Sequence, residues 1–327
     1  MDAQVVVVGS YVQDHVWLVD RFPDIGETRR GSGFHVGPGG KGFNQAIACL
    51  RQGAPTLFVG AIGDDALGAA AQAFAAAEGL PCRWQRRSDV PTAAAGVLVD
   101  DAGANVVVVN LAANERLDPA HVAAQAGTFA AAKILLLQLE SNLAAVAAAL
   151  DLGARHGLLR VLNPAPMHAD LDAALLTRCN VVTPNETEFA LLLERFAHVR
   201  IAAATLAERD DADLHALARR LGVATVVVTL GAHGCLVSHA EADRHGDDAA
   251  YYRLAAEPAR VLDSTGAGDA FSGALAAALL HFHGRPFRTA AEHANRAAAL
   301  STEVVGAAPA MPRFDAVARR FASVPRR

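Results

Sequence analysis

The stretch VLDSTGAGDAFSGALAAAL, residues 261–279, joins a short apolar run to a segment rich in Ala and Leu through a turn of small residues. It predicts a strand that ends at Asp263 and a helix that begins near Ala267. The N–H groups of residues 266–268 would then have no intrahelical partners, and such groups bind anions. Asp269 would lie in the first turn, where the helix dipole favours the ionised carboxylate, which can accept a proton. An anion site beside a carboxylate base suits phosphoryl transfer to a hydroxyl.

A simpler interpretation of the same residues is a tight strand-to-helix turn that only the fold requires. Asp269 would then be a charge at the start of a helix and nothing more. These residues alone leave both interpretations open, so the rest of the chain has to separate them.

The composition is that of an ordinary globular protein. With 327 residues and 52% hydrophobic content, the chain can bury a large core, and it predicts a single domain over residues 1–327. The formal charge of −5 and the scattered Arg pairs argue against a nucleic-acid partner. The N-terminal apolar run is too short for a signal peptide or a membrane span, so we expect a cytoplasmic protein without a membrane partner.

The four cysteines are far apart in the sequence and form no CxxC pair. No His stands at metal-ligand spacing from any of them, which argues against a disulfide framework or a zinc site. We therefore expect reduced, mostly buried thiols at Cys49, Cys82, Cys179 and Cys235.

Apolar strand segments alternate with helical segments along most of the chain. The valine run from Gln4 to Gly9 is typical of a central parallel strand that is buried on both faces. This βα rhythm predicts a parallel sheet with helices on both faces. The further predicted strands are residues 56–60, 134–138, 159–162, 180–183 and 225–229. The predicted helices are residues 44–52, 66–78, 119–131, 143–156, 171–176, 186–194, 208–220, 267–283 and 287–303, with a final helix after the loop 304–312.

Two interruptions break this rhythm. Residues 11–37 mix period-2 apolar stretches with Gly and Pro, and the interruption at 83–113 contains the hairpin signal Asp100-Asp101-Ala102-Gly103. We expect segments of about 11–37 and 88–113 to form a small β flap.

A polar segment follows the last predicted parallel strand. Residues 231–238 predict a hairpin return, and residues 239–250, which carry Asp, His and Gly, predict an exposed turn of little consequence. His239 and His245 are then expected to have solvated or packing roles rather than catalytic ones.

The sequence GPGGKG, residues 37–42, stands at the start of a predicted helix. It lacks the spacing and the Ser or Thr of a GxxxxGK[ST] phosphate loop, and no such loop occurs elsewhere in the sequence. Its glycines would let a ligand approach the backbone, and Lys41 and Asn44 on the first helical turn could bond hydroxyls. A glycine turn that only caps the helix is the alternative.

Two longer motifs carry a resemblance to a known family. GGKGFNQAIACLRQGA (residues 39–54) and DSTGAGDAFSGAL (residues 263–275) resemble the two signatures of the ribokinase/PfkB carbohydrate kinase family, and within it the chain is most similar to ribokinases. Shorter motifs follow in the family's order, namely QLE at 138–140, NPAP at 163–166, TPNETE at 183–188 and TLG at 229–231. The resemblance extends from Val5 to about Pro312. It implies a ribokinase-like three-layer α/β sandwich with a central, mainly parallel sheet and a small β-sheet lid.

The resemblance implies a catalytic centre at the second signature. Asp269 would deprotonate the sugar hydroxyl, and the N–H groups of Gly266, Ala267 and Gly268 would form the anion hole for the transferred phosphoryl group. The residues that match sugar-binding positions are Asp14, Gly40, Lys41, Asn44, Glu140 and Asp269. Carboxylates and amides of this kind pair well with the hydroxyls of a small polyol.

ATP, Mg²⁺ and a monovalent cation, K⁺, are the implied cofactors. The residues that match nucleotide-binding positions are Asn185, Thr229, Gly231, Gly268 and Asn295. Glu188 would lie near Mg²⁺ and act through water. The residues that match a monovalent-cation site are Asp263, Thr265, Ser301, Val304, Gly306 and Ala310. Asn185 and Glu188 also fit a helix N-cap with its capping-box partner, and the two roles are compatible.

The implied activity is ATP-dependent phosphorylation of the primary hydroxyl of D-ribose to ribose 5-phosphate, with the flap closing over the sugar as a lid that excludes water. The exposed strand edges of the flap favour a homodimer that forms through the lid. Two features depart from the ribokinase pattern: Val12 stands where ribokinases usually carry Asn, and the turn at 266–268 is Gly-Ala-Gly rather than the more usual Ala-Ala-Gly.

Other acceptors stay open at this stage. They are another small sugar, such as fructose or deoxyribose, or a nucleoside, for which Phe43 and Trp17 would supply aromatic contacts. A non-catalytic sugar sensor belongs to a third class, and it would be expected to lack Asp269 or the glycines of the anion hole. The chain has both, which favours an enzyme.

Overall fold

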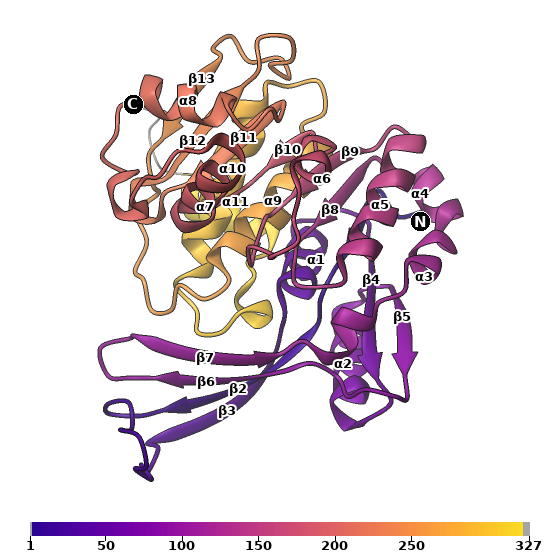
Figure 1. Cartoon of the computed structure of the whole chain (residues 1–327), viewed down its shortest axis with the longest axis vertical. Helices are drawn as coiled ribbons and strands as arrows, with labels where there is room; N and C mark the ends of the chain where they lie inside the picture. The colour runs from indigo at the N-terminus through magenta and orange to yellow at the C-terminus, as the bar shows by residue number, and fades with distance from the viewer. Residues whose placement is uncertain (1, 323–327) are drawn as a thin grey trace.

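Two β-sheets of different size form the framework of the molecule (Figure 1). The structure is a computed structural model and describes residues 2–322. The strands of the larger sheet are, in spatial order, β13 (Tyr251–Leu254), β12 (Cys235–His239), β11 (Thr225–Thr229), β10 (Val181–Val182), β9 (Leu159–Leu162), β8 (Ile134–Leu137), β1 (Val5–Val8), β4 (Thr56–Gly63) and β5 (Cys82–Arg87). Neighbours from β11 to β5 pair in parallel, whereas β12 and β13 pair antiparallel. The predicted mainly parallel sheet is confirmed.

The side chains of the larger sheet alternate between two hydrophobic cores, one on each face. Val5 and Val7 of β1 belong to one core, and Val6 and Val8 belong to the other, because successive side chains of a strand point to opposite faces. The helices of the first face are α1 (Lys41–Arg51), α2 (Ala66–Glu78), α9 (Ala267–His281), α10 (Phe287–Ser301) and α11 (Phe314–Phe321). Those of the second face are α3 (Pro119–Ala123), α4 (Ala126–Ala131), α5 (Leu143–Arg155), α6 (Ala173–Thr177), α7 (Glu186–Ala197) and α8 (Asp211–Arg219). No helix within residues 2–322 combines the length and the apolar composition that crossing a membrane requires.

Three local predictions were wrong. Strands β5 and β13 were not predicted. The edge strand β5, for example, reads CRWQRR and has no apolar run. The expected helix 119–131 is divided into α3 and α4, with Gln125 between them. The predicted strand before Asp263 does not form, and Val261 and Leu262 are 63% and 57% exposed. This segment is held instead by the N–H groups of Leu262 and Asp263, which donate to the carbonyl of Thr302.

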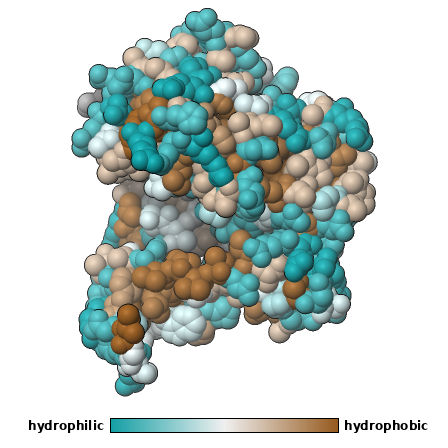
Figure 2. Space-filling view, viewed as in Figure 1, coloured by the Kyte–Doolittle hydropathy of each residue, from teal (hydrophilic) through white to brown (hydrophobic). Residues whose placement is uncertain are grey.

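The smaller sheet consists of β3 (Gly33–Gly39), β2 (Val12–Leu18), β6 (Ala94–Val99) and β7 (Asn105–Asn110), in that spatial order. It projects away from the larger sheet at the carboxyl end of β1 (Figure 1). Strand β2 pairs antiparallel with β3 and parallel with β6, and β6 pairs antiparallel with β7. The predicted flap thus exists as a separate sheet. Figure 2 shows that a continuous hydrophobic band covers part of it.

The segment 239–250 is the predicted exposed turn only in part, because residues 241–243, 246 and 248 are exposed but two of its polar side chains are buried. His239 ends β12 and is fully buried, and Asp247 is nearly so. The carboxylate of Asp247 lies 3.1 Å from Nε2 of His239 and accepts a hydrogen bond of 2.6 Å from the hydroxyl of Tyr252. It also accepts one from the N–H of Arg288 in the first turn of α10. The polar residues satisfy one another in the interior, so the segment anchors the start of α10.

Candidate active site

Helix α1 begins close to the start of the smaller sheet because its N-terminus is made of glycines. Gly40 has a φ of +88°, and a Cβ atom there would lie 2.6 Å from the backbone nitrogen of Val12. A Cβ atom on Gly39 would collide with the carboxylate of Asp14. These two positions therefore accept only glycine without a shift of the backbone or of Asp14. They bring the first turn of α1, with Lys41 and Asn44, beside Asp14.

Helix α9 supplies the residue predicted as the base. Gly266 has a φ of +76° and precedes the first helical residue. Asp269 in the first turn is only 5% exposed. Its Oδ2 atom accepts a hydrogen bond of 2.9 Å from Nδ2 of Asn44, and its Oδ1 atom accepts one of 2.8 Å from Nε2 of Gln45. Two side chains of α1 thus hold the carboxylate of α9.

A second carboxylate supports the start of α1. Glu140 lies three residues after the end of β8, and its Oε2 atom accepts hydrogen bonds from the N–H of Lys41 at 2.8 Å and from the hydroxyl of Ser10 at 2.6 Å. The Ser10 hydroxyl in turn accepts a hydrogen bond from the N–H of Gly42. These contacts satisfy two N–H groups that the first turn of a helix leaves unpaired.

The acids and the one lysine of this region perturb each other. Burial raises the pKa of Asp14 to about 7, and the nearby charges of Glu140 and Asp269 add to the rise. Burial also raises the pKa of Glu140. For Lys41 burial acts to lower the pKa, but the carboxylates of Asp269, Glu140 and Glu188 outweigh it and the pKa is raised. The site therefore keeps one fixed positive charge among several acids, and Asp14 exchanges its proton near neutral pH.

A cavity of about 480 Å³ lies on one side of the turn that precedes α9. Its lining includes Ser264 and Ala267 of that turn. All five residues that were predicted to bind the nucleotide line this cavity, namely Asn185, Thr229, Gly231, Gly268 and Asn295. They come from the ends of β10 and β11, from α9 and from α10. The structure brings these widely spaced residues to one place.

A second cavity, of about 650 Å³, lies on the other side of the same turn. It is bounded by the smaller sheet, through Asp14, Val16 and Val97, and by the loops 261–265 and 305–309. Ser264 lines both cavities. The turn before α9 therefore separates a cavity next to Asp14 from the cavity that holds the predicted nucleotide residues.

Asn185 and Glu188 form the capping box that their spacing predicts. The N–H of Glu188 donates to Oδ1 of Asn185, and the N–H of Asn185 donates to Oε2 of Glu188, both at 2.9 Å. Burial raises the pKa of Glu188. The positive charge of Lys41 opposes this rise, and the negative charge of Asp269 adds to it. The helix-capping role of the pair is confirmed, and a role toward a metal ion stays a prediction.

The residues predicted for a monovalent cation come from two loops that meet. The carboxylate of Asp263 accepts hydrogen bonds from the N–H groups of Thr265 at 2.8 Å and of Gly306 at 2.9 Å. Ser301 is buried at the end of α10, Val304 is exposed beyond it, and Ala310 ends a 3₁₀ turn. Within residues 2–322, no group of three or more His, Cys, Asp or Glu side chains is placed to hold a metal ion.

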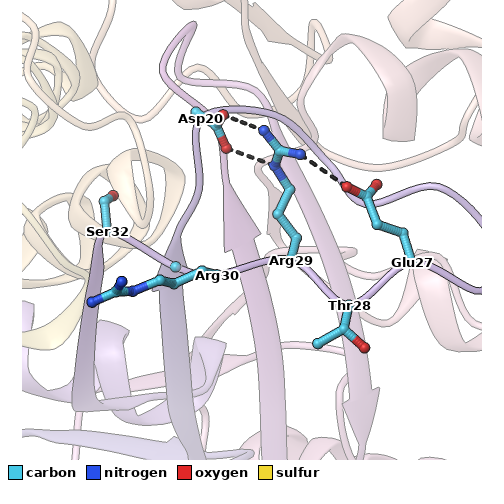
Figure 3. Close-up of a pocket in the computed structure, with 7 residues that line it drawn as sticks. Asp20, Glu27, Thr28, Arg29, Arg30 and Ser32 are labelled. Atoms are coloured by element: carbon cyan, nitrogen blue, oxygen red, sulfur yellow. Dashed lines mark hydrogen bonds and ion pairs between the residues drawn. The ribbon is translucent and has the colours of Figure 1, made fainter.

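A further pocket lies in the loop 20–32 beyond the strands of the smaller sheet (Figure 3). The guanidinium of Arg29 pairs there with the carboxylates of Asp20 and Glu27, as the dashed lines of Figure 3 show. Arg29, Asp20 and Glu27 satisfy one another within the loop, and none of the predicted site residues lines this pocket. This pocket is therefore separate from the candidate site.

Sequence reasoning gave no role to Gln45, Ser10 or Asn163, although Gln45 lies inside the first quoted signature. Nε2 of Gln45 donates to both Asp269 and Oδ1 of Asn163. The one signal in the sequence was a second polar residue directly after Asn44 in a helix whose following residues are apolar. A helical residue one position from a site residue ordinarily points elsewhere, so this signal was weak.

Comparison with known proteins places these features in a family. The sequence family described as pfkB family carbohydrate kinase matches residues 2–313. The ribokinase of Mus musculus is 33% identical over 313 residues, which cover 95% of this chain and 92% of that protein. A deoxyribokinase of Salmonella typhi is 29% identical over 279 residues, which cover 83% of this chain and 84% of that protein.

Solved structures of ribokinases have the same fold. The ribokinase of Giardia lamblia has a TM-score of 0.87 at 29% identity and covers 99% of this chain and 100% of its own. The structure of the Arabidopsis thaliana ribokinase complexed with ribose and ATP has a TM-score of 0.80 at 28% identity, with 98% of each chain covered. These similarities extend over the whole molecule, the smaller sheet included.

Proposed function

Because the chain belongs to the pfkB family of carbohydrate kinases, we propose that it is an ATP-dependent ribokinase, which phosphorylates the primary hydroxyl of D-ribose to give ribose 5-phosphate. One observation carries this proposal. The turn before α9 lies between a cavity next to Asp14 and a cavity lined by Asn185 and Asn295. Asp269 follows this turn in the first turn of α9 and is not among the residues that line either cavity. Two substrates bound on either side of the turn would meet beside the start of the helix that carries the proposed base. Similarity to ribokinases, one of them solved with ribose and ATP, supports this choice of substrates.

The reaction needs a proton acceptor and an anion site at the same point. Asp269 accepts the proton of the primary hydroxyl, and the oxygen attacks the γ-phosphorus of ATP while the bond from that phosphorus to the oxygen that bridges to the β-phosphate breaks and ADP leaves. The N–H groups of Gly266, Ala267 and Gly268 would stabilise the negative charge of the phosphoryl group in transfer. The N–H of Ala267 donates to the carbonyl of Ser264 at 3.2 Å in this structure, so it would have to leave that acceptor to bind a phosphoryl oxygen. Asn44 holds one oxygen of Asp269 and so keeps the carboxylate oriented toward the sugar.

The sugar hydroxyls have matching partners around the first turn of α1. The Oδ1 atom of Asn44 is buried and has no hydrogen-bond partner, so a sugar hydroxyl can donate to it. Ionised Asp14 accepts further hydroxyl donors, and Lys41 and Glu140 complete the polar set. Gly40 packs against the backbone of Tyr11 and Val12 and thereby holds the start of α1 beside these groups.

Mg²⁺ fits this site as a companion of ATP. Glu188 is a single buried carboxylate, and Mg²⁺ needs few protein ligands because it keeps waters and binds phosphate oxygens. When bound, the ion neutralises phosphate charge. Glu188 would hold it through water, while its bonds to Asn185 keep the carboxylate in place.

A K⁺ ion would be held mainly by carbonyl oxygens of the two loops that Asp263 joins. The residues would be Asp263, Thr265, Ser301, Val304, Gly306 and Ala310. Such an ion would fix the turn whose N–H groups form the anion hole. Stimulation of turnover by KCl but not by NaCl would test it, and equal rates in the two salts would count against it.

Phe43 and Trp17, the aromatic residues that left a nucleoside acceptor open, pack against other side chains of the protein. Phe43 is fully buried and packs edge-on against Tyr11 and Phe58. Trp17 packs against Phe34 at a centroid distance of 4.9 Å and does not line the cavity next to Asp14. The aromatic residues of the two predicted contacts therefore do not line that cavity. Its lining from the sheet combines the apolar side chains of Val16, Leu18, Val36, Val97 and Val99 with the polar side chains of Asp14, His35 and Asn105. A small sugar is favoured, and deoxyribose remains the alternative that the Salmonella relative supports.

We further propose a homodimer that forms through the smaller sheet. The cross-strand pairs Trp17–Phe34 and Trp17–Leu98 share one face of this sheet with Val106, which pairs with Leu98. Directly opposite residues lie on the same face, and several of these side chains are exposed. An exposed apolar face of this kind indicates an interaction surface.

Since ATP is a cytoplasmic substrate, we also propose that the protein is cytoplasmic, which cell fractionation would test.

A panel assay tests the proposed activity. The purified protein is incubated with ATP, Mg²⁺ and one acceptor at a time, and ADP release is measured for ribose, deoxyribose, fructose and adenosine. We expect ribose to give the highest kcat/KM. A higher value for fructose or adenosine would contradict the named substrate, and no release with any acceptor would contradict the enzyme class.

A further inference from the structure

Three polar residues follow three adjacent strands at the carboxyl edge of the larger sheet. Gln138, Asn163 and Thr183 come directly after β8, β9 and β10. The strand ends are in register, because Leu137 pairs with Leu162 and Leu162 pairs with Val182. All three polar side chains are buried. They form a row beneath the helices that carry the site.

This row and Gln45 form a hydrogen-bonded network with only one consistent orientation. Nδ2 of Asn163 donates to the carbonyl of Thr183 at 2.8 Å, so Oδ1 of Asn163 must face Gln45. The hydroxyl of Thr183 lies 2.9 Å from that of Ser272 on α9. Nε2 of Gln138 donates to Oε1 of Gln45 at 2.6 Å. Since Oδ1 of Asn163 and the carboxylate of Asp269 are both acceptors, the amide of Gln45 must present its NH₂ group to them and its Oε1 atom to Gln138, whose own Oε1 atom has no partner among the described residues.

We propose that Gln45 is a positioning residue that fixes the orientation of the Asp269 carboxylate for proton transfer, and that the Gln138–Gln45–Asn163 network holds it in the active orientation. The inference rests on the proposed role of Asp269 as the base. Asn44 and Gln45 each hold one oxygen of Asp269, because Asn44 donates to Oδ2 and Gln45 donates to Oδ1. A carboxylate held at both oxygens cannot rotate about its last torsion.

Gln45 differs from Asn44 in one respect that a kinetic experiment can detect. Asn44 keeps a free acceptor atom, whereas both polar atoms of Gln45 are used within the protein and its side chain is fully buried. Gln45 therefore cannot contact the sugar. Its loss should lower the rate of the chemical step and leave ground-state binding of the sugar nearly unchanged.

Gln45→Met is the first test, because Met has a similar length and no donor. We expect kcat to fall about 10- to 100-fold, as for the loss of a hydrogen bond to a charged group, while the KM for the sugar that the wild type prefers changes less than about threefold. Gln72→Met on α2 is the control, since that side chain bonds only its own helix. A wild-type kcat in Gln45→Met, or a raised KM with normal kcat, would overturn the inference.

Gln45→Glu adds a readout that a purely structural role would not move. A carboxyl group at position 45 can donate to Asp269 only while it is protonated, so the ratio of mutant to wild-type kcat should fall steadily as the pH rises. A ratio that is constant with pH contradicts the proposal. Gln138→Met removes the donor to Oε1 of Gln45, and position 138 lies outside both helices of the site. This variant should lower kcat about three- to tenfold and serves if Gln45→Met does not fold.

The outcomes separate this inference from the proposed function. If the wild type phosphorylates no sugar of the panel, the proposed function is wrong. If the wild type is active and Gln45→Met and Gln138→Met equal it, the function stands and the positioning role is wrong.

Discussion

Nδ2 of Asn44 lies 2.9 Å from Oδ2 of Asp269, although 225 residues separate the two in the sequence. The contact depends on the close packing of α1 on α9. A Cβ atom on Gly273 of α9 would lie 2.5 Å from the Cβ of Ala48 and 2.6 Å from the carbonyl oxygen of Gln45. The distance between the two helices therefore decides whether the carboxylate meets its donors.

Gly273→Ala should consequently separate the helices and damage both stability and catalysis. We expect a loss of about 1–3 kcal/mol in the free energy of unfolding, as for overpacked cores, together with a lower kcat. Urea unfolding and the ADP-release assay measure the two effects. Gly127→Ala is the matched control, because Gly127 is also helical, a Cβ atom there meets nothing within 4 Å, and Ala is the better helix former. Equal behaviour of the two variants would show that the helix contact tolerates a methyl group.

Asp269→Asn should abolish most of the activity and spare sugar binding. Loss of a general base costs typically 10²- to 10⁴-fold in rate, so we expect kcat to fall by about that factor, while the Kd of the sugar from calorimetry changes only a few-fold. Asp315→Asn is the control, since Asp315 is an exposed first-turn acid of α11 that pairs with Arg319 on the surface. Near-normal turnover in Asp269→Asn would remove Asp269 from the role of base.

The pKa of Asp14, which burial raises to about 7, predicts a pH-dependent KM. Below that pH the carboxyl group is protonated and cannot accept a second hydroxyl donor, so the KM for the sugar should rise roughly tenfold from pH 8 to pH 6. Asp14→Asn should have a high KM that does not vary over this range. A wild-type KM that stays constant with pH would mean that the sugar does not need ionised Asp14.

The raised pKa of Asp14 also predicts that the folded protein becomes less stable as the pH rises, whereas sugar binding becomes tighter over the same change. This pKa is higher in the folded protein than in the unfolded chain, so the folded state binds more protons between about pH 4 and 7 and loses stability as the pH rises through this window. Asp14→Asn should therefore raise the Tm more at pH 8 than at pH 5. Thermal unfolding at the two pH values tests this, and an equal shift at both would contradict the linkage.

Glu188→Gln separates the capping role of this residue from its proposed role toward Mg²⁺. Gln also serves as a capping-box partner, so the Tm should stay within about one degree of the wild type. The Mg²⁺ concentration for half-maximal rate should rise several-fold, because the substitution removes the negative charge of Glu188 near the ion. An unchanged Mg²⁺ requirement would leave Glu188 with the cap alone.

Val108 tests the dimer that we propose. It lies on β7 and is 73% exposed. Val108 pairs with Gly96, which in turn pairs with His15. Trp17 is two residues after His15 on the same strand, so Val108 and Trp17 lie on the same face of the sheet. Val108→Lys should shift the mass measured by light scattering from dimer toward monomer. Ile25→Lys is the control, because Ile25 is fully exposed in the loop before β3. If both variants have the mass of the wild type, this face does not form the interface.

Much of the fold could be predicted from the sequence because its central strands are continuous apolar runs. The valines of β1 and β11 are buried on both faces, and such runs have few alternatives. The edges were harder, since β5 and β13 each have one side without a strand partner and carry polar residues there. The prediction for segment 239–250 failed in part for a related reason: its His and Asp are buried because they pair with each other, and no single residue of the pair reveals that.

The candidate site also has residues that a local sequence pattern indicates and residues that it does not. The predicted position of Asp269, Lys41 and Asn44 in the first turns of two helices is confirmed, and the glycines before each helix were the signal for it; the roles of the three residues stay predictions. Gln45 could not be predicted, because its role depends on Gln138 and Asn163, which reach it from two strands more than 90 residues away in the sequence. Which amides face one another is a property of the strand register and not of local pattern.

The packing of α1 on α9 also has a consequence for synthesis on the ribosome. Helix α9 emerges some 225 residues after its partner, a delay of roughly 10–45 s at about 5–20 residues per second. During that time Ala48 and Cys49, which are covered in the finished protein and lie against Gly273 of α9, lack this packing partner. The nascent chain therefore carries an exposed apolar helix face for most of its translation, and the enzyme becomes competent only when its last quarter has docked.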